Sequence, residues 1–82
     1  MKISKKTVSG KFLEVTLYSK KSQLVHVRII NFAGISKLSV WEVIEKGDNI
    51  VTINISTLAK GPYKIILDFA EENSKEDIFA IS

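Results

Sequence analysis

Apolar and polar residues alternate along most of this chain, so that every second side chain within a run is apolar. The clearest runs are Leu13–Leu17, Val25–Ile29, Val51–Ile55 and Tyr63–Leu67. A period of two is typical of β-strands that bury one face, whereas amphipathic helices repeat at about 3.6 residues. No stretch follows the helical period. The pattern therefore predicts antiparallel sheets that pack together through their apolar faces.

Residues with turn chemistry separate these runs. Asn31-Phe32-Ala33-Gly34 predicts a hairpin turn, with Asn31 at the first position and Gly34 at positive φ. Gly47-Asp48 predicts a second turn, and the polar residues 71–74 predict a hairpin loop. The turn signals therefore divide the chain into short segments of strand length.

Three further strands are expected, which brings the total to about seven at intervals of about 8–12 residues. The sequence thus predicts one domain over residues 1–82, an all-β antiparallel immunoglobulin-like sandwich, with a small barrel as the alternative. The three additional strands are expected near residues 2–7, 37–45 and 78–81.

The segment between the runs at Val51–Ile55 and Tyr63–Leu67 predicts a tight crossing. Ser56 can cap one helical turn over residues 56–60 and direct Leu58 into the core. Gly61 can take positive φ and reverse the chain, while Pro62 belongs at the start of a strand. Tyr63 is expected to bury its ring while its hydroxyl reaches a backbone group near the crossing.

Two segments resemble the C-terminal sorting domains of proteins exported by type IX secretion. They are Val25–Gly34, an alternating strand that enters an Asn-x-x-Gly turn, and Ile53–Ile65, which has a "strand, Ser, Leu, two residues, Gly-x-Tyr, strand" pattern. The resemblance covers residues 11–81, and small exported immunoglobulin-like proteins of unknown function share it. The last strand lacks the basic residue that sorting domains commonly carry. The motif residues are Asn31, Gly34, Ser56, Leu58, Gly61 and Tyr63.

The resemblance implies a protein that is exported to the cell surface or secreted, with the export signal outside this chain. It also implies a protein partner, either the secretion machinery or another domain of the parent protein. The function expected on this basis is a non-enzymatic sorting module. The alternative is a stand-alone binding or adhesion module for carbohydrate or protein.

The strand expected near residues 37–45 is apolar on both faces. Trp41 and Val43 share one face, and Val40 and Ile44 share the other. We expect Trp41 to pack in the core. In the alternative, Trp41 is exposed and forms a contact patch with Phe32 or Ile30 for a protein, a second copy or a sugar, and homo-oligomers form through strand edges.

The composition supplies no chemical machinery for catalysis. The chain has no cysteine, and His26 is its single histidine, which rules out a cysteine-based metal site and leaves little for a triad. His26 alternates with Val25 and Val27, so it is expected to face solvent or the rim of a sheet. The sequence therefore predicts that the protein is not an enzyme, and it predicts neither a cofactor, a metal ion nor a transmembrane segment.

Positive charge is concentrated near the N-terminus. Although the net charge is +3, six of the lysines lie within residues 1–21, where Glu14 is the one acidic residue. Nucleic-acid-binding surfaces usually combine arginine with aromatic residues, and this segment has no arginine. We therefore interpret the lysines as protection of an edge strand and its loops, and we expect no nucleic-acid partner.

Overall fold

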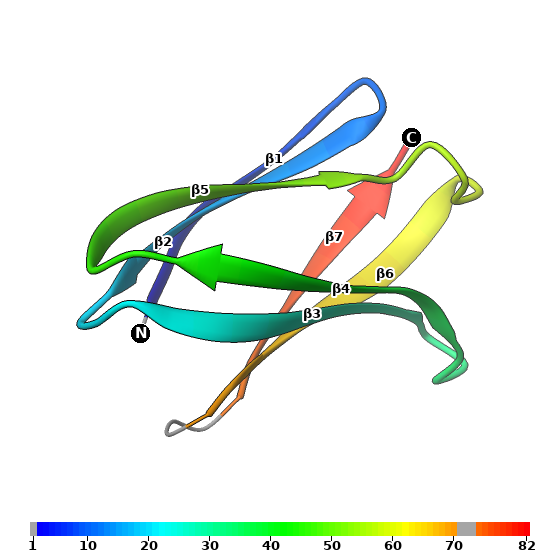
Figure 1. The fold of residues 1–82 in the computed structure, drawn as a ribbon. Coiled ribbons are helices and arrows are strands. Elements are labelled where there is room, and N and C mark those ends of the chain that lie inside the picture. Colours follow the sequence, from blue (N-terminus) through cyan, green and yellow to red (C-terminus); the bar gives the residue numbers. More distant parts are fainter. Residues whose placement is uncertain (1, 71–73) are drawn as a thin grey trace.

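Strands of seven to nine residues form most of the chain in the computed structural model, which describes residues 2–70 and 74–82 (Figure 1). The described residues include no helix, and therefore no helix that could cross a membrane. The strands are β1 (Lys2–Ser9), β2 (Phe12–Ser19), β3 (Gln23–Asn31), β4 (Ser36–Ile44), β5 (Gly47–Asn54), β6 (Gly61–Phe69) and β7 (Lys75–Ile81).

The strands form two antiparallel sheets. One sheet has the order β1-β2-β5, and the other has the order β4-β3-β6-β7. The connections β1–β2, β3–β4 and β6–β7 are hairpins within a sheet, while β2–β3, β4–β5 and β5–β6 cross from one sheet to the other. The predicted all-β antiparallel architecture is therefore confirmed.

The core lies between the two sheets and consists of the apolar residues that alternate along the strands. Leu13, Val15 and Leu17 of β2 are fully buried, as is Ile29 of β3. Leu38, Val40, Leu58 and Ile81 pack at the margins of the core. The alternating runs in the sequence thus correctly identified the inner face of the central strands. The other buried apolar residues are Val25, Val27, Ile44, Val51, Ile53, Ile55, Tyr63, Ile65, Leu67, Phe69 and Phe79.

The turn predicted at Gly47-Asp48 lies elsewhere in the structure. Gly47 and Asp48 belong to β5, and the chain changes direction at residues 45–46 instead. The side chain of Asn49 stabilises this turn, because Asn49 Oδ1 accepts a hydrogen bond from Glu45 N (2.9 Å) and Nδ2 donates to Glu45 O (2.8 Å). The polar loop predicted at residues 71–74 falls mostly outside the described residues.

The predicted helical turn at residues 56–60 is wrong. A β-turn takes its place, in which Leu58 N donates to Ile55 O (3.0 Å). The side chain that stabilises this segment is that of Asn54 and not that of Ser56, because Asn54 Oδ1 accepts a hydrogen bond from Ser56 N (2.9 Å). An Asn side chain commonly closes such a turn by bonding the backbone two residues later. Leu58 is half-buried and packs against the core, as expected.

Each sheet ends in strands with one unpaired edge. In the smaller sheet one of these is β1, which agrees with the edge strand inferred from the N-terminal lysines. In the larger sheet the two edge strands are β4 and β7. The position of β4 matters most for function, since β4 carries Trp41.

Candidate functional site

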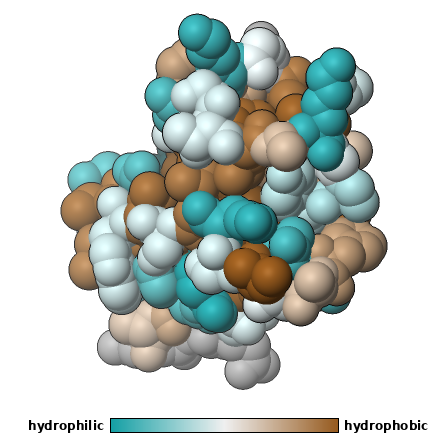
Figure 2. All heavy atoms as spheres, turned by 90° about the vertical axis from the view of Figure 1, so that its right-hand side faces the viewer, coloured by the Kyte–Doolittle hydropathy of each residue, from teal (hydrophilic) through white to brown (hydrophobic). Residues whose placement is uncertain are grey.

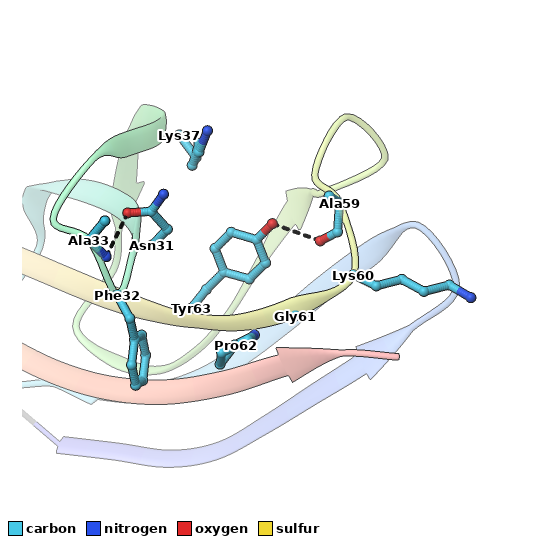
Figure 3. Close-up of a pocket in the computed structure, with 9 residues that line it drawn as sticks. All are labelled: Asn31, Phe32, Ala33, Lys37, Ala59, Lys60, Gly61, Pro62 and Tyr63. Atoms are coloured by element: carbon cyan, nitrogen blue, oxygen red, sulfur yellow. Dashed lines mark hydrogen bonds between the residues drawn. The ribbon is translucent and has the colours of Figure 1, made fainter.

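The two segments with the motif pattern meet at one end of the sandwich. Asn31 at the end of β3 lies directly opposite Tyr63 near the start of β6. Between the segments is an open pocket of about 400 Å³, here named the Tyr63 pocket (Figure 3). Figure 2 views the molecule from the right-hand side of Figure 1, where this end lies, and shows hydrophobic residues exposed between hydrophilic ones. The pocket is lined by Asn31, Phe32, Ala33, Lys37, Ala59, Lys60, Gly61, Pro62 and Tyr63.

The turn after β3 has the predicted form. Asn31 O accepts a hydrogen bond from Gly34 N (3.0 Å), and Gly34 has a φ of 84°. The side chain of Asn31 strengthens the turn, because its Oδ1 accepts hydrogen bonds from Ala33 N (3.0 Å) and Ile35 N (2.9 Å). The oxygen atoms of Asn31 are thus occupied inside the turn, which gives this residue a structural role.

Tyr63 joins the other motif segment to the core. Tyr63 is 6% exposed, and its ring stacks on Phe79 with ring centroids 5.8 Å apart. Its hydroxyl donates a hydrogen bond to Ala59 O (2.7 Å), as Figure 3 shows. Gly61, between the two, has a φ of 140°, a conformation that side chains disfavour. The predicted bond from Tyr63 to the backbone and the positive φ of Gly61 are both confirmed.

The Tyr63 pocket therefore has few groups left for chemistry. Both oxygens of Asn31, in its backbone and its side chain, accept hydrogen bonds from backbone N–H groups of the turn after β3. The Tyr63 hydroxyl donates to the backbone of the segment before β6. Lys37 and Lys60 supply the charge among its lining residues. Among the described residues, no three His, Asp or Glu side chains are grouped closely enough to hold a metal ion. We interpret this region as the part of the scaffold that fixes the crossing between strands.

Trp41 does not pack in the core, contrary to our first expectation. Trp41 is 63% exposed and Val43 is 72% exposed, so both point away from the other sheet. The reason is that Val40 and Ile44 form the face of β4 that packs on the core, which leaves Trp41 and Val43 on the opposite face. The alternative of an exposed aromatic surface is the one that the structure bears out.

His26 holds the indole of Trp41 in place. The two residues are directly opposite each other on β3 and β4. Their rings stack with centroids 4.3 Å apart and an interplanar angle of 12°. His26 Nε2 is also hydrogen-bonded to Ser39 Oγ, so the imidazole is fixed from a second side. One face of the indole is thus supported by the protein while most of the side chain stays exposed.

A polar pair borders the two rings on the other side. Arg28 reaches one oxygen of Asp68 with two nitrogens, at 2.9 Å from Nη2 and 3.0 Å from Nε to Oδ2. Asp68 lies directly opposite His26 on β6. Both side chains are more than one third exposed, so the pair contributes little to stability. Its effect is to leave this part of the surface without net charge.

A second cavity, of about 250 Å³, opens beside Trp41. Its lining is mainly apolar, with Asp68 as the one carboxylate. Leu24, which is 48% exposed, lies directly opposite Val43 and extends the apolar surface. We name this surface, made of Leu24, His26, Trp41, Val43 and Asp68, the Trp41 face. The residues that line the cavity are Leu24, His26, Trp41, Asp68, Phe69 and Ala70.

Phe32 and Ile30 do not belong to the Trp41 face. Phe32 is 56% exposed in the turn after β3, with Lys64 Nζ 5.5 Å from its ring centroid. Phe32 follows Asn31, which is five residues from His26 along β3, a separation of about 17 Å. Ile30 is half-buried and lies opposite Lys64. The predicted contact surface thus divides into two separate parts.

Sequence reasoning did not include Leu24, His26 or Asp68 in the contact surface. Leu24 and His26 lie two residues apart on the polar face of β3, and Leu24 interrupts the alternation because it is apolar. That interruption is the one signal for Leu24 in the sequence. Asp68 comes close to His26 and Arg28 only because β6 pairs with β3. Arg28 and Asp68 are 40 residues apart in the sequence, so no local pattern predicts their contact.

Comparisons of this chain with protein-family models, with curated proteins and with solved structures find no match.

Proposed function

We propose that this chain is a non-enzymatic docking module of an exported protein, and that it binds a protein partner through the Trp41 face. The observation that carries the proposal is the exposed indole of Trp41, held by His26 at the edge of a sheet. Exposed aromatic residues among apolar neighbours are typical centres of protein interfaces. Because its position is fixed before binding, the indole loses little freedom when a partner arrives.

Two features support an immunoglobulin-like scaffold for this module. A three-stranded sheet packs on a four-stranded sheet, and β4 pairs with β3 at the edge of the larger sheet. Variable-type immunoglobulin domains add a strand at the corresponding edge. Tyr63, at the start of β6, bonds the backbone four residues upstream, at Ala59. Immunoglobulin-like domains have a tyrosine at the corresponding corner with the same kind of hydrogen bond. The scaffold proposal thus rests on strand order and on one side-chain contact.

The surroundings of Trp41 favour protein over carbohydrate as the partner. Leu24 and Val43 flank the indole, and four of the six residues that line the adjacent cavity are apolar. The carboxylate that lines this cavity, Asp68, is already paired with Arg28. An apolar side chain of a partner fits such a surface better than a sugar ring, which needs several hydrogen bonds.

Site-specific photo-cross-linking in the native cell tests this function. A photoreactive residue replaces Val43 on the Trp41 face, and a matched control replaces Ile50, which is 66% exposed on the other sheet. We expect a discrete cross-linked protein from position 43, loss of that product with Trp41→Ala, and none from position 50. Equal labelling at both positions, or none at position 43, would contradict the proposal.

A sorting role is a second proposal, and the meeting of both motif segments at the Tyr63 pocket favours it. The test is to fuse residues 1–82 to the C-terminus of a secreted reporter, in a bacterium with type IX secretion. We expect the reporter at the cell surface, and we expect Asn31→Ala to reduce export more than Phe12→Ala, a control on the other sheet. Retention of the wild-type fusion in the periplasm would refute the sorting role.

A further inference from the structure

The Trp41 face borders a strand edge that has no partner among the described residues. β4 pairs with β3 on one side and is the last strand of its sheet on the other. An edge of this kind presents backbone N–H and C=O groups that another strand can bind. Trp41 lies near the middle of β4, with one face of its indole against His26. A partner that covers the edge therefore also covers the indole.

We propose that the partner is a second copy of this chain, and that the two β4 strands pair antiparallel about a two-fold axis at Trp41. The inference rests on the proposed function, for which it names the partner. In this arrangement the two indoles lie directly opposite each other, where cross-strand side chains are close enough to stack. The two four-stranded sheets become one continuous sheet across the interface.

The charges on and next to β4 favour this register. Lys37 lies on β4 four residues before Trp41, and Glu45, the first residue after β4, lies four residues after Trp41. If the pairing of the two copies extends one residue beyond β4, the two-fold axis places Lys37 of one copy opposite Glu45 of the other, twice. Within one copy, Glu45 Oε2 accepts a hydrogen bond from Ser22 Oγ (2.9 Å). Lys37 and Glu45 are both exposed. No like charges face each other in this arrangement. A two-fold axis at Glu42, by contrast, places two carboxylates directly opposite one another, which is unfavourable.

One residue weakens the proposed interface. Glu42 is half-buried on the core side of β4 and faces Val40 of the second copy in this register. A charge on the inner face of an edge strand is a known protection against indiscriminate pairing. The dimer is therefore expected to be reversible and to form as the protein concentration rises. Glu42→Thr, which removes the charge and keeps a residue suited to strands, is expected to tighten it at least tenfold.

The first experiment follows the purified chain over a range of concentrations by light scattering. The expected mass rises from 9.2 kDa toward twice that value. Circular dichroism supplies a second measurement, because the chain contains one tryptophan and any exciton coupling between indoles must join two copies. We expect a couplet that grows with dimer content. A dimer without the couplet would overturn the register, and a constant mass of one chain would overturn the dimer.

Substitutions then locate the interface. Trp41→Ala is expected to weaken dimerisation at least tenfold, while the matched control Ile50→Ala on the other sheet leaves it unchanged. Both residues are exposed, so melting temperatures close to wild type will show that the folds are intact. Equal effects of the two substitutions would overturn the assignment to β4.

Charge reversal tests the register. Lys37→Glu and Glu45→Lys are each expected to weaken the dimer several-fold, because each places like charges opposite one another. The double variant Lys37→Glu/Glu45→Lys restores the opposite charges and is expected to recover most of the lost affinity. Failure of the double variant to recover would overturn the two-fold axis at Trp41.

The outcome also separates this inference from the docking function. A chain that stays monomeric while position 43 cross-links to a different protein in the cell overturns the second copy and retains the docking module. A chain that stays monomeric and gives no cross-link at position 43 overturns both proposals. A cross-linked product with the mass of two chains supports both.

Discussion

The Tyr63 pocket and the Trp41 face are each built around an aromatic stack, and they differ in what surrounds it. Tyr63 is 6% exposed, rests on Phe79 and bonds Ala59 through its hydroxyl. Trp41 rests on His26 but is 63% exposed. A ring whose surface and polar group are both satisfied within the chain stabilises the fold. A ring that is supported on one face and exposed on the other is available to a partner.

The contrast makes Tyr63 the position where substitution should cost most. Tyr63→Ala removes a buried ring and a hydrogen bond, for a loss of roughly 3–5 kcal/mol. The whole domain of 82 residues is expected to have a free energy of unfolding of roughly 4–12 kcal/mol. We therefore expect Tyr63→Ala to be largely unfolded or close to it, as measured by urea denaturation.

Tyr63→Phe separates the ring from the hydroxyl. It keeps the packing on Phe79 and loses the bond to Ala59, which costs about 1 kcal/mol, or a decrease in melting temperature of about 4–8 °C. A melting temperature equal to wild type would mean that the hydrogen bond in the pocket contributes nothing. The structural role of the corner would then rest on packing alone.

Substitution of Gly61 should cause the second largest loss in the free energy of unfolding. The φ of 140° at Gly61 is unfavourable for any residue with a Cβ, and an added Cβ meets no atom within 4 Å. The expected loss for Gly61→Val is about 1–3 kcal/mol, and it comes from backbone strain and not from a clash. Gly61→Ala provides the control. A similar loss in both variants identifies strain as the cause, whereas a loss confined to valine would show that space is limiting.

Asn31 should have a smaller effect of the same kind. Asn31→Ala leaves the N–H groups of Ala33 and Ile35 without the Oδ1 acceptor, for an expected loss of about 1–2 kcal/mol in thermal or chemical unfolding. Both N–H groups are exposed enough for water to replace part of each bond. Asn31→Asp keeps an oxygen acceptor at the same place and is expected to retain most of the stability. Equal losses in the two variants would contradict this explanation.

The difference between the two regions also explains how far the sequence could predict them. The Asn31 turn, Gly61 and Tyr63 depend on residues close together in the chain, where turn chemistry and strand period are informative. The predicted cap at Ser56 is wrong because Leu58 N donates to Ile55 O in a β-turn, while the backbone N–H of Ser56 itself donates to Asn54 Oδ1. Local patterns thus predicted the scaffold and erred where a β-turn closed by Asn54 takes the place of a helical turn.

The Trp41 face depends on contacts that no local pattern records. Trp41 and Val43 alternate with Val40 and Ile44, so the sequence defines two apolar faces of β4 without showing which one is covered. The answer comes from the packing of the two sheets, which covers Val40 and Ile44 and leaves Trp41 on the outer face, opposite His26. The preference for burial was reasonable for tryptophan and wrong here, because burial depends on the neighbouring strand and not on the residue.

Trp41 should therefore be the position where stability responds least. Trp41→Ala removes a largely exposed side chain and one stacking contact, so the expected change in the free energy of unfolding is about 0–1 kcal/mol. Measured at low concentration, the emission of the wild-type protein should be that of an indole in water, since Trp41 is the single tryptophan. His26→Ala is the informative companion, because it removes the support of the ring without removing the ring. If Trp41→Ala instead destabilised the domain as much as Tyr63→Ala, or if the emission were that of a buried indole, Trp41 would belong to the scaffold and the distinction between the two regions would fail.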